Sequence, residues 1–291
     1  MSEVIKKAAI IGGGVIGAGW AARFVLNGID VNVYDPSAEA EKNLAEVLSN
    51  AKHAYSKLTM APLLNPGKIR FVDTIKVAVK GMMFIQESVP ENLNLKETAL
   101  KEIDNFAPEK AIICSSTSGI KPSQLQDVMK RPNRFMVGHP FNPVYLLPLV
   151  EICGGKKTSN ESKDFAAQFY KKIGMKPLIL RKEIDAFIAD RLLEAVWREG
   201  LWLIRDDVAT TEELDDAIRF GFGLRWAQMG LFETYRIAGG KAGMRHFISQ
   251  FGPTLSWPWT RLMDVPDLNQ DLIDKIVEQS DKQSSNHSIR D

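Results

Sequence analysis

The feature that most constrains this chain is a glycine pattern near its start, which lies between an apolar segment and an amphipathic one. The spacing G-x-G-x-x-G in such a strand–turn–helix unit is typical of a site for a dinucleotide diphosphate. The first glycine permits a tight turn, the second lets the backbone approach the phosphates, and the third lets the helix pack on the strand. The alternative is a glycine-rich turn in another kind of α/β protein. We expect the diphosphate to be bound by Gly12, Gly13, Gly14, Val15, Ile16 and Gly17.

An acidic residue supports this interpretation. A second apolar run, Val31–Tyr34, leads directly into Asp35, about 20 positions after Gly14, where the acidic residue of a Rossmann unit binds the adenine ribose. A carboxylate would repel a 2′-phosphate, and the segment Pro36–Glu39 contains no arginine to neutralise one. The sequence therefore predicts NAD rather than NADP as the cofactor.

Short apolar segments alternate with amphipathic ones as far as residue 182. We predict strands over Ala8–Ile11, Asp30–Tyr34, Ile69–Val72, Met82–Gln86, Ala111–Ser115, Arg134–Val137, Leu149–Ile152 and Lys176–Leu180. We predict helices between them over Val15–Asn27, Ala38–Lys57, Leu93–Phe106 and Lys163–Ile173. This alternation is typical of a Rossmann-type α/β fold with a doubly wound, mostly parallel sheet.

Beyond Lys182 the strand pattern fades. Asp185–Arg205 has the periodicity of a long helix, and Thr210 with Glu213 resembles a capping box at the start of a further helix, Leu214–Arg219. We predict that residues 1–182 form the NAD-binding domain. Residues 183–291 would form an all-helical domain for substrate binding and dimerisation. The polar segment Gln279–Asp291 would be a frayed tail or a helix that needs a partner.

Composition excludes several classes of partner. The chain has 291 residues, 45% of them hydrophobic, and a net charge of +1 with scattered Lys and Arg, so nucleic acid and anionic membrane are not expected partners. No apolar run approaches the roughly 20 residues of a membrane span, and the first residues lack the apolar stretch of a secretory signal. Two cysteines, Cys114 and Cys153, exclude a disulfide framework and a Cys-based zinc site. We expect a cytoplasmic protein that binds no metal.

Polar groups follow three of the predicted strands. They are Glu87, the Ser116–Gly119 segment and the His139–Pro143 segment, and Glu151 comes later in the chain. Ligands of open α/β sheets bind outside the carboxyl ends of the strands, so we expect these groups to lie together. A histidine there could take an alcohol proton as hydride leaves, with a carboxylate to hold the imidazole and a hydroxyl to orient the substrate oxygen. Taken singly, a surface histidine and a simple turn are the alternatives.

Four segments in combination resemble the 3-hydroxyacyl-CoA dehydrogenase family over nearly the whole chain. These segments are the glycine motif, Gln86–Asn92, Ser115–Ser118, and His139–Pro143 with Glu151. The resemblance implies an NAD-dependent oxidation of a 3-hydroxy acid. In it His139 would be the general base, Glu151 its carboxylate partner and Ser118 the residue that orients the substrate. Asn142 and Glu87 would lie near the nicotinamide.

One position departs from the family. Ala186–Leu193 resembles the segment that opens a helix in this family, but Asp190 stands where the family commonly has asparagine. The carboxylate could offset a positive charge on the substrate or raise the basicity of His139. Alternatively, it could complement the dipole of the helix that it opens.

Within the family, the C-terminal half is most similar to the members that oxidise carnitine, and the resemblance implies a homodimer. The segments that carry this likeness are Gly138–Glu151, Phe220–Gly230, Gln250–Pro253 and Trp257–Trp259. A quaternary ammonium group is recognised by aromatic faces and negative charge, so Phe141, Phe187 and Asp190 are candidate substrate residues. Arg191, Arg198 and Arg225 are candidate partners for a substrate carboxylate. The alternatives are a 3-hydroxyacyl-CoA or L-gulonate-type dehydrogenase, and a non-catalytic NAD-binding protein.

Overall fold

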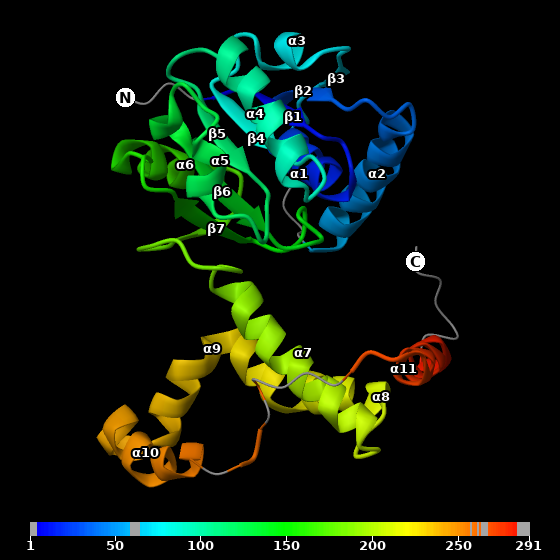
Figure 1. Cartoon of the computed structure of the whole chain (residues 1–291), viewed down its shortest axis with the longest axis vertical. Coiled ribbons are helices and arrows are strands. Elements are labelled where there is room, and N and C mark those ends of the chain that lie inside the picture. The colour runs from blue at the N-terminus through cyan, green and yellow to red at the C-terminus, as the bar shows by residue number, and fades with distance from the viewer. Residues whose placement is uncertain (1–4, 59–64, 257, 261, 263–266, 284–291) are drawn as a thin grey trace. The chain divides into compact units, whose positions relative to one another are not determined.

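The computed structural model describes residues 5–58, 65–256, 258–260, 262 and 267–283. The chain divides into two compact units, Met1–Asp190 and Arg191–Asp291 (Figure 1). The sequence places its domain boundary slightly earlier, after residue 182, and that boundary stays a prediction.

The first unit is built on an eight-stranded sheet with the order β3-β2-β1-β4-β5-β6-β7-β8. The strands are β1 Lys7–Ile11, β2 Asp30–Tyr34, β3 Ile69–Phe71, β4 Phe84–Glu87, β5 Ile112–Ser115, β6 Phe135–Pro140, β7 Leu149–Gly154 and β8 Lys176–Ile179. Neighbouring strands are parallel except β6 and β7, which are antiparallel. The predicted mostly parallel, doubly wound sheet is therefore confirmed.

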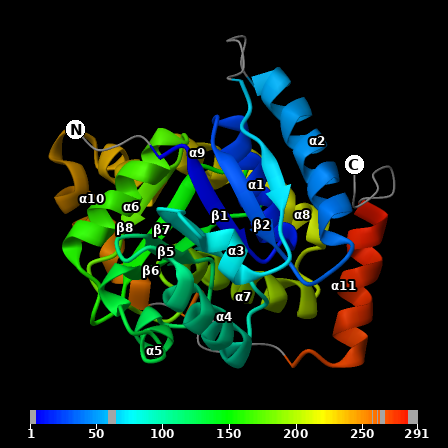
Figure 2. The ribbon, with the colours of Figure 1, turned by 90° about the horizontal axis from the view of Figure 1, so that it is seen from above.

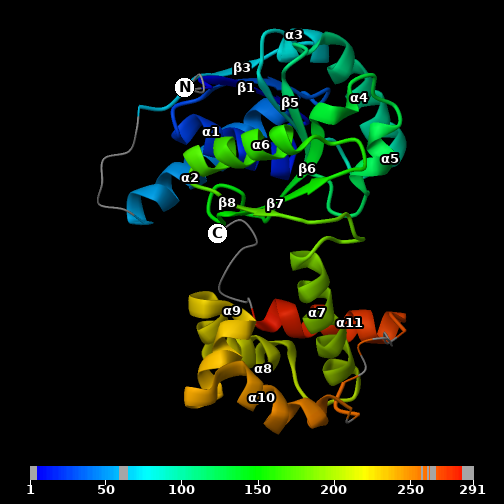
Figure 3. The ribbon, with the colours of Figure 1, turned by 90° about the vertical axis from the view of Figure 1, so that its left-hand side faces the viewer.

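Helices cover both faces of this sheet (Figures 2 and 3). They are α1 Val15–Leu26, α2 Ala40–Leu58, α3 Ile75–Val79, α4 Leu93–Phe106, α5 Pro122–Gln126 and α6 Asn160–Lys172, with a 3₁₀ turn η1 at Pro132–Arg134. Because side chains alternate along a strand, Ala8 and Ile10 of β1 pack with α1, α2 and α6. Ala9 and Ile11 pack with α3, α4 and α5 on the opposite face. Burial on both faces explains why these strands have continuous apolar sequences.

The described residues of the second unit form helices and no strand, as predicted. The helices are α7 Ala189–Arg205, which begins in the first unit, α8 Thr211–Asp216, η2 Ala217–Phe222, α9 Gly223–Ala238, η3 Gly240–Ala242, α10 Gly243–Phe251, η4 Gly252–Ser256 and α11 Gln270–Gln283. Thr210 and Glu213 form the predicted capping box, which opens α8 at Thr211. The predicted polar tail overlaps the end of α11, and residues 284–291 lie outside the described residues, as does Trp257. None of the described helices is long and apolar enough to cross a membrane.

Candidate active site

The turn between β1 and α1 requires glycine at two positions. Gly12 has a φ of +95°, and a Cβ there would lie 2.6 Å from the backbone of Ser88, at the end of β4. A Cβ at Gly17 would lie 1.8 Å from the carbonyl oxygen of Gly12, so only glycine lets α1 pack against this turn. A Cβ at Gly14 would meet nothing within 4 Å, because the backbone here faces open space.

This open space fits a dinucleotide. Gly14 is the N-cap of α1 and gives it no side-chain cap, so the first N–H groups of the helix are available to an anion. Asp35 accepts hydrogen bonds from the backbone N–H groups of Gly13, at 2.6 Å, and Ser37, at 2.8 Å, which fix its carboxylate beside the turn. The groove has a volume of about 350 Å³ and is lined by Gly12, Gly14, Val15, Ile16, Asp35, Ser88, Val89, Pro90, Glu91, Lys96, Ser116 and Ser118.

Glu87 does not line this groove. Its side chain is fully buried, and it accepts hydrogen bonds from the ammonium of Lys96 at 3.0 Å, the N–H of Val89 at 2.7 Å and the hydroxyl of Ser115. Burial raises the pKa of Glu87, against the opposing effects of Lys96 and Ser115. Glu87 therefore holds the start of the loop after β4, and its predicted place near the nicotinamide stays a prediction.

Sequence reasoning missed Glu91 and Lys96, which do line the groove. Glu91 accepts from the N–H of Gly119 at 3.0 Å, and its other oxygen lies 3.5 Å from the Lys96 ammonium. The contact with Gly119 joins the loops after β4 and β5. Sequence spacing gives no sign of this, because Glu91 and Gly119 meet only once β4 and β5 lie side by side.

A hydrogen-bond network connects the sheet interior to the groove. The carbonyl of Gly138 can only accept, so the amide nitrogen of Gln86 faces it at 3.3 Å and also donates to Ser116 Oγ at 2.8 Å. Trp20, whose indole N–H is donor only, reaches the same Ser116 Oγ at 3.1 Å. With both its lone pairs engaged, Ser116 must donate its own proton to Ser88 Oγ, 2.8 Å away. No other partner of Ser88 Oγ lies among the described residues.

His139 and Glu151 lie directly opposite each other on β6 and β7. The sequence predicts His139 in a loop after a strand; that placement is wrong, because β6 extends to Pro140 and pairs with β7. His139 Nδ1 lies 3.0 Å from Glu151 Oε2, and both side chains are buried. The other oxygen, Oε1, accepts from the N–H groups of Ile188 and Ala189, at 3.0 Å each.

Those two N–H groups reach Glu151 because the preceding residues, Ala186 and Phe187, have φ values of 57° and 50°. Left-handed backbone at such residues costs roughly 1–2 kcal/mol each, and the two charge-assisted hydrogen bonds to Glu151 offset this cost. The helix therefore starts at Ala189, later than the predicted Asp185. Asp190 follows, and its Oδ2 lies 3.6 Å from His139 Nε2.

The candidate aromatic residues differ in burial. The ring of Phe141 lies 5.2 Å from that of His139 and is half-buried. The ring of Phe187 lies 5.5 Å from that of His139, but Phe187 is only 1% exposed and packs in the core with Val137, Cys153 and Leu180. A role for Phe187 in cation binding stays a prediction.

The remaining candidates are placed as follows. Ser118 is exposed in the groove, whereas Asn142 is exposed after β6 and is not among the groove-lining residues. Arg191, Arg198 and Arg225 belong to the second unit, where Arg198 pairs with Glu194 at 3.2 Å. Their binding of a substrate carboxylate stays a prediction.

Cys114 and Cys153 are buried free thiols, and burial raises the pKa of each to about 12. Neither is therefore a thiolate nucleophile at neutral pH. Within the described part of the chain, no group of three or more His, Cys, Asp or Glu residues could hold a metal ion.

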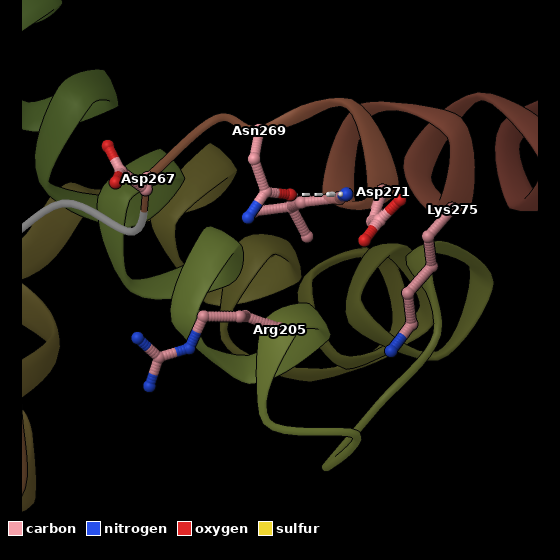
Figure 4. Close-up of a pocket in the computed structure, with 6 residues that line it drawn as sticks. Arg205, Asp267, Asn269, Asp271 and Lys275 are labelled. Carbon is pink, nitrogen blue, oxygen red and sulfur yellow. Dashed lines mark hydrogen bonds between the residues drawn. The ribbon is translucent and has the colours of Figure 1, made fainter.

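The second unit has a polar pocket of about 360 Å³ beside the start of α11 (Figure 4). Asn269 Oδ1 accepts from the N–H of Leu272 at 3.0 Å and so caps α11. The two cations that line the pocket are paired, Lys275 with Asp207 and Arg205 with Asp206. Asn269, Arg205 and Lys275 of this pocket therefore cap a helix or form ion pairs. None of the described residues that line it is a histidine paired with a carboxylate, as His139 is with Glu151.

Comparison with known proteins matches both units to one family. Residues 7–184 match the NAD binding domain of 3-hydroxyacyl-CoA dehydrogenase, and residues 187–278 match the C-terminal domain of the same enzyme. The chain belongs to the 3-hydroxyacyl-CoA dehydrogenase family. This confirms the family predicted from the four segments, its oxidoreductase class and NAD as its cofactor.

Individual relatives are more specific. Over 99% of its length the chain is 60% identical to an L-carnitine dehydrogenase of Mesorhizobium japonicum, of which it covers 80%. It is equally similar to an L-carnitine dehydrogenase/betainyl-CoA thioesterase of Rhizobium meliloti, but spans only 58% of that protein. Among solved structures, a 5-formyl-3-hydroxy-2-methylpyridine 4-carboxylic acid 5-dehydrogenase is 28% identical with a TM-score of 0.82, covering 99% of this chain and 89% of its own.

Proposed function

We propose that this chain oxidises the 3-hydroxyl of L-carnitine to 3-dehydrocarnitine with NAD, using His139 as general base. The observation that carries the proposal is the buried pair of His139 and Glu151, with the further carboxylate of Asp190 beside the free ring nitrogen. The names of the close relatives support carnitine as the substrate.

Glu151 sets the protonation of the base. Its Oε2 accepts, so Nδ1 of His139 carries a proton and donates it, which leaves the lone pair of Nε2 for the substrate hydroxyl. Because two backbone N–H groups hold its Oε1, the carboxylate keeps its orientation as the imidazole becomes charged. The proton of the hydroxyl passes to Nε2, and the negative charge of Glu151 stabilises the imidazolium that forms.

NAD, when bound, supplies the hydride acceptor for the hydrogen on C3. Gly12, Gly14 and the start of α1 would hold its diphosphate, and Asp35 its adenine ribose. Ser118, exposed in the same groove, would donate to the substrate oxygen and keep it directed at His139. As the hydroxyl proton leaves, the C3–O bond becomes a carbonyl.

The test is the His139→Gln variant assayed with L-carnitine. Loss of the base should lower kcat by roughly 10²–10⁴, while the affinity for NAD, measured by calorimetry, stays unchanged because His139 does not line the groove. Glu151→Gln should also lower kcat, and the double variant should be little worse than either single one, because the two residues act as a unit.

Two results would contradict the proposal. Near-normal turnover in a folded His139→Gln protein would show that another group is the base. Wild-type oxidation of 3-hydroxybutyryl-CoA or gulonate, with none of carnitine, would assign the site to a different 3-hydroxy acid.

We also infer that the chain acts in the cytoplasm as a homodimer assembled through its helical unit. Large apolar side chains are exposed on the helices of that unit, as interfaces between subunits require; they include Leu192, Leu193, Trp197, Phe220 and Phe232. Sedimentation equilibrium of the purified chain should give twice the monomer mass of 32.5 kDa. A monomer at micromolar concentration would contradict the inference.

A further inference from the structure

His139 lies between two carboxylates, one on each ring nitrogen. Glu151 approaches Nδ1 at 3.0 Å and Asp190 approaches Nε2 at 3.6 Å. Glu151 is fully buried and already accepts hydrogen bonds at both oxygens. The Asp190 side chain is 24% exposed. Of the two carboxylates, Asp190 is the one beside the reacting nitrogen and accessible to a substrate.

We propose that Asp190 determines which enantiomer of carnitine is oxidised, by attracting the trimethylammonium arm to its side of the site. This proposal rests on the proposed function, since it assumes that carnitine is the substrate and that Nε2 of His139 takes the hydroxyl proton.

The argument is stereochemical. The C3 atom of carnitine bears a hydroxyl, a hydrogen, a CH₂–N(CH₃)₃⁺ arm and a CH₂–COO⁻ arm. The hydroxyl must face Nε2, and the hydrogen must face the hydride acceptor. Two positions then remain for the two arms, and exchanging the arms between these positions converts one enantiomer into the other.

Charge is what distinguishes the two arms at these positions. Each arm carries its charged group one methylene from C3, so whichever arm lies toward Asp190 brings its charge close to that carboxylate. The trimethylammonium group cannot donate an N–H hydrogen bond, and its recognition relies on nearby negative charge and aromatic faces. Asp190 supplies the negative charge. The half-buried ring of Phe141, which lies 5.2 Å from the ring of His139, supplies an aromatic face. The opposite enantiomer would place a carboxylate against Asp190.

Asp190 has two other possible roles, and neither would depend on the enantiomer. It could stabilise the charged imidazole of His139, or it could complement the dipole of α7 as an acidic residue in the first turn. Either role would affect L-carnitine, D-carnitine and an analogue that lacks the cation alike. The ratio of the two enantiomers therefore isolates the proposed role.

The experiment compares kcat/KM for L-carnitine, D-carnitine and 3-hydroxybutyrate in the wild type, Asp190→Asn and Asp190→Glu. Asp190→Asn should lower kcat/KM for L-carnitine about 10- to 100-fold, as expected for losing a close ion pair at a partly exposed site. It should lower the ratio of L- to D-carnitine by a similar factor, and should change 3-hydroxybutyrate, which has no cation, by less than about threefold. Asp190→Glu keeps the charge and should retain most of the preference.

Asp271→Asn is the matched control, because Asp271 is likewise in the first turn of a helix, α11, in the second unit. It should leave all three substrates unaffected, and thermal denaturation should show that each variant is folded. Equal losses on all three substrates in Asp190→Asn, or an unchanged enantiomer ratio, would overturn the proposal. If the wild type oxidised neither carnitine enantiomer, the proposed function would fail instead.

Discussion

The hydroxyl of Ser88 is restricted by its neighbours to act as a hydrogen-bond donor toward the groove. Trp20 and Gln86 both donate to Ser116, so Ser116 donates to Ser88, and the proton of Ser88 is left for a ligand in the groove. Gln86 is itself oriented from the core by Tyr170, whose hydroxyl donates to its carbonyl oxygen at 2.6 Å. The network thus presents a donor, not an acceptor, at the end of β4.

We predict that Ser88→Ala weakens the binding of NAD and of ADP-ribose about three- to tenfold, which is the range for one neutral hydrogen bond. AMP should bind unchanged, because β4 lies across β1 from β2, the strand that leads into Asp35. Calorimetric dissociation constants check this. Ser56→Ala, which removes an exposed hydroxyl from α2, is the control and should bind all three ligands as the wild type does. Equal weakening of AMP would mean that Ser88 acts only on the fold.

Three elements, β6, β7 and α7, meet at Glu151. Its side chain on β7 holds the base on β6 and also the first N–H groups of α7, so the strand pair and the helix start share one carboxylate. The segment that carries Phe187 and Asp190 is therefore positioned by the same residue that orients His139. A second close contact, between α1 and the turn after β1, likewise depends on one residue, Gly17.

Two glycine variants should separate the packing of α1 against this turn from the binding of the NAD diphosphate beside it. Gly17→Ala forces a Cβ against the carbonyl oxygen of Gly12, and we expect it to lower the free energy of unfolding by about 3 kcal/mol. Gly14→Ala meets no protein atom, so it should unfold like the wild type yet bind NAD more weakly, because its methyl group enters the space for the diphosphate. Urea denaturation and calorimetry measure the two effects. A fully stable Gly17→Ala protein would contradict this account of α1.

For the molecule as a whole, stability in acid should depend on Asp104. This buried residue of α4 accepts from the N–H groups of Lys130 and Arg131 at 2.6 and 3.2 Å, and from Arg134 at 2.7 Å. Although burial acts in the opposite direction, these bonds hold the pKa of Asp104 below its ordinary value. Its folded-state pKa is thus lower than its unfolded-state pKa, so its stabilisation is present above about pH 4 and is lost as pH falls through the folded value.

We therefore expect Asp104→Asn to lower Tm clearly at pH 7, and the difference from the wild type to shrink as the pH is lowered below about 4. Asp127→Asn is the control, because Asp127 pairs with Lys157 at the surface, and such pairs contribute at most about 1 kcal/mol. Thermal denaturation followed by circular dichroism measures both. A difference for Asp104→Asn that does not change with pH would show that its charge is not what stabilises the fold.

The class of fold and the cofactor follow from local patterns in the sequence. The glycine spacing, Asp35 and the alternation of strands and helices depend on local geometry, since a tight turn, a helix N-terminus and a strand period are each set by neighbouring residues. The ends of the predicted strands indicated His139, Glu151 and the Ser116–Gly119 segment as candidates, and family resemblance assigned the roles of His139, Glu151 and Ser118. The structure pairs His139 with Glu151 at 3.0 Å.

The contacts that hold the site together, in contrast, follow from the way the chain folds. Strand pairing places His139 within β6 and brings Glu151 to the start of α7. Strand pairing also buries Glu87, while Glu91 and Lys96 line the groove. The left-handed backbone at Ala186 and Phe187 likewise requires Glu151 to offset its cost. Such contacts join residues far apart in the chain. No local pattern encodes them, because each exists only when separate strands have been brought to the same edge of the sheet.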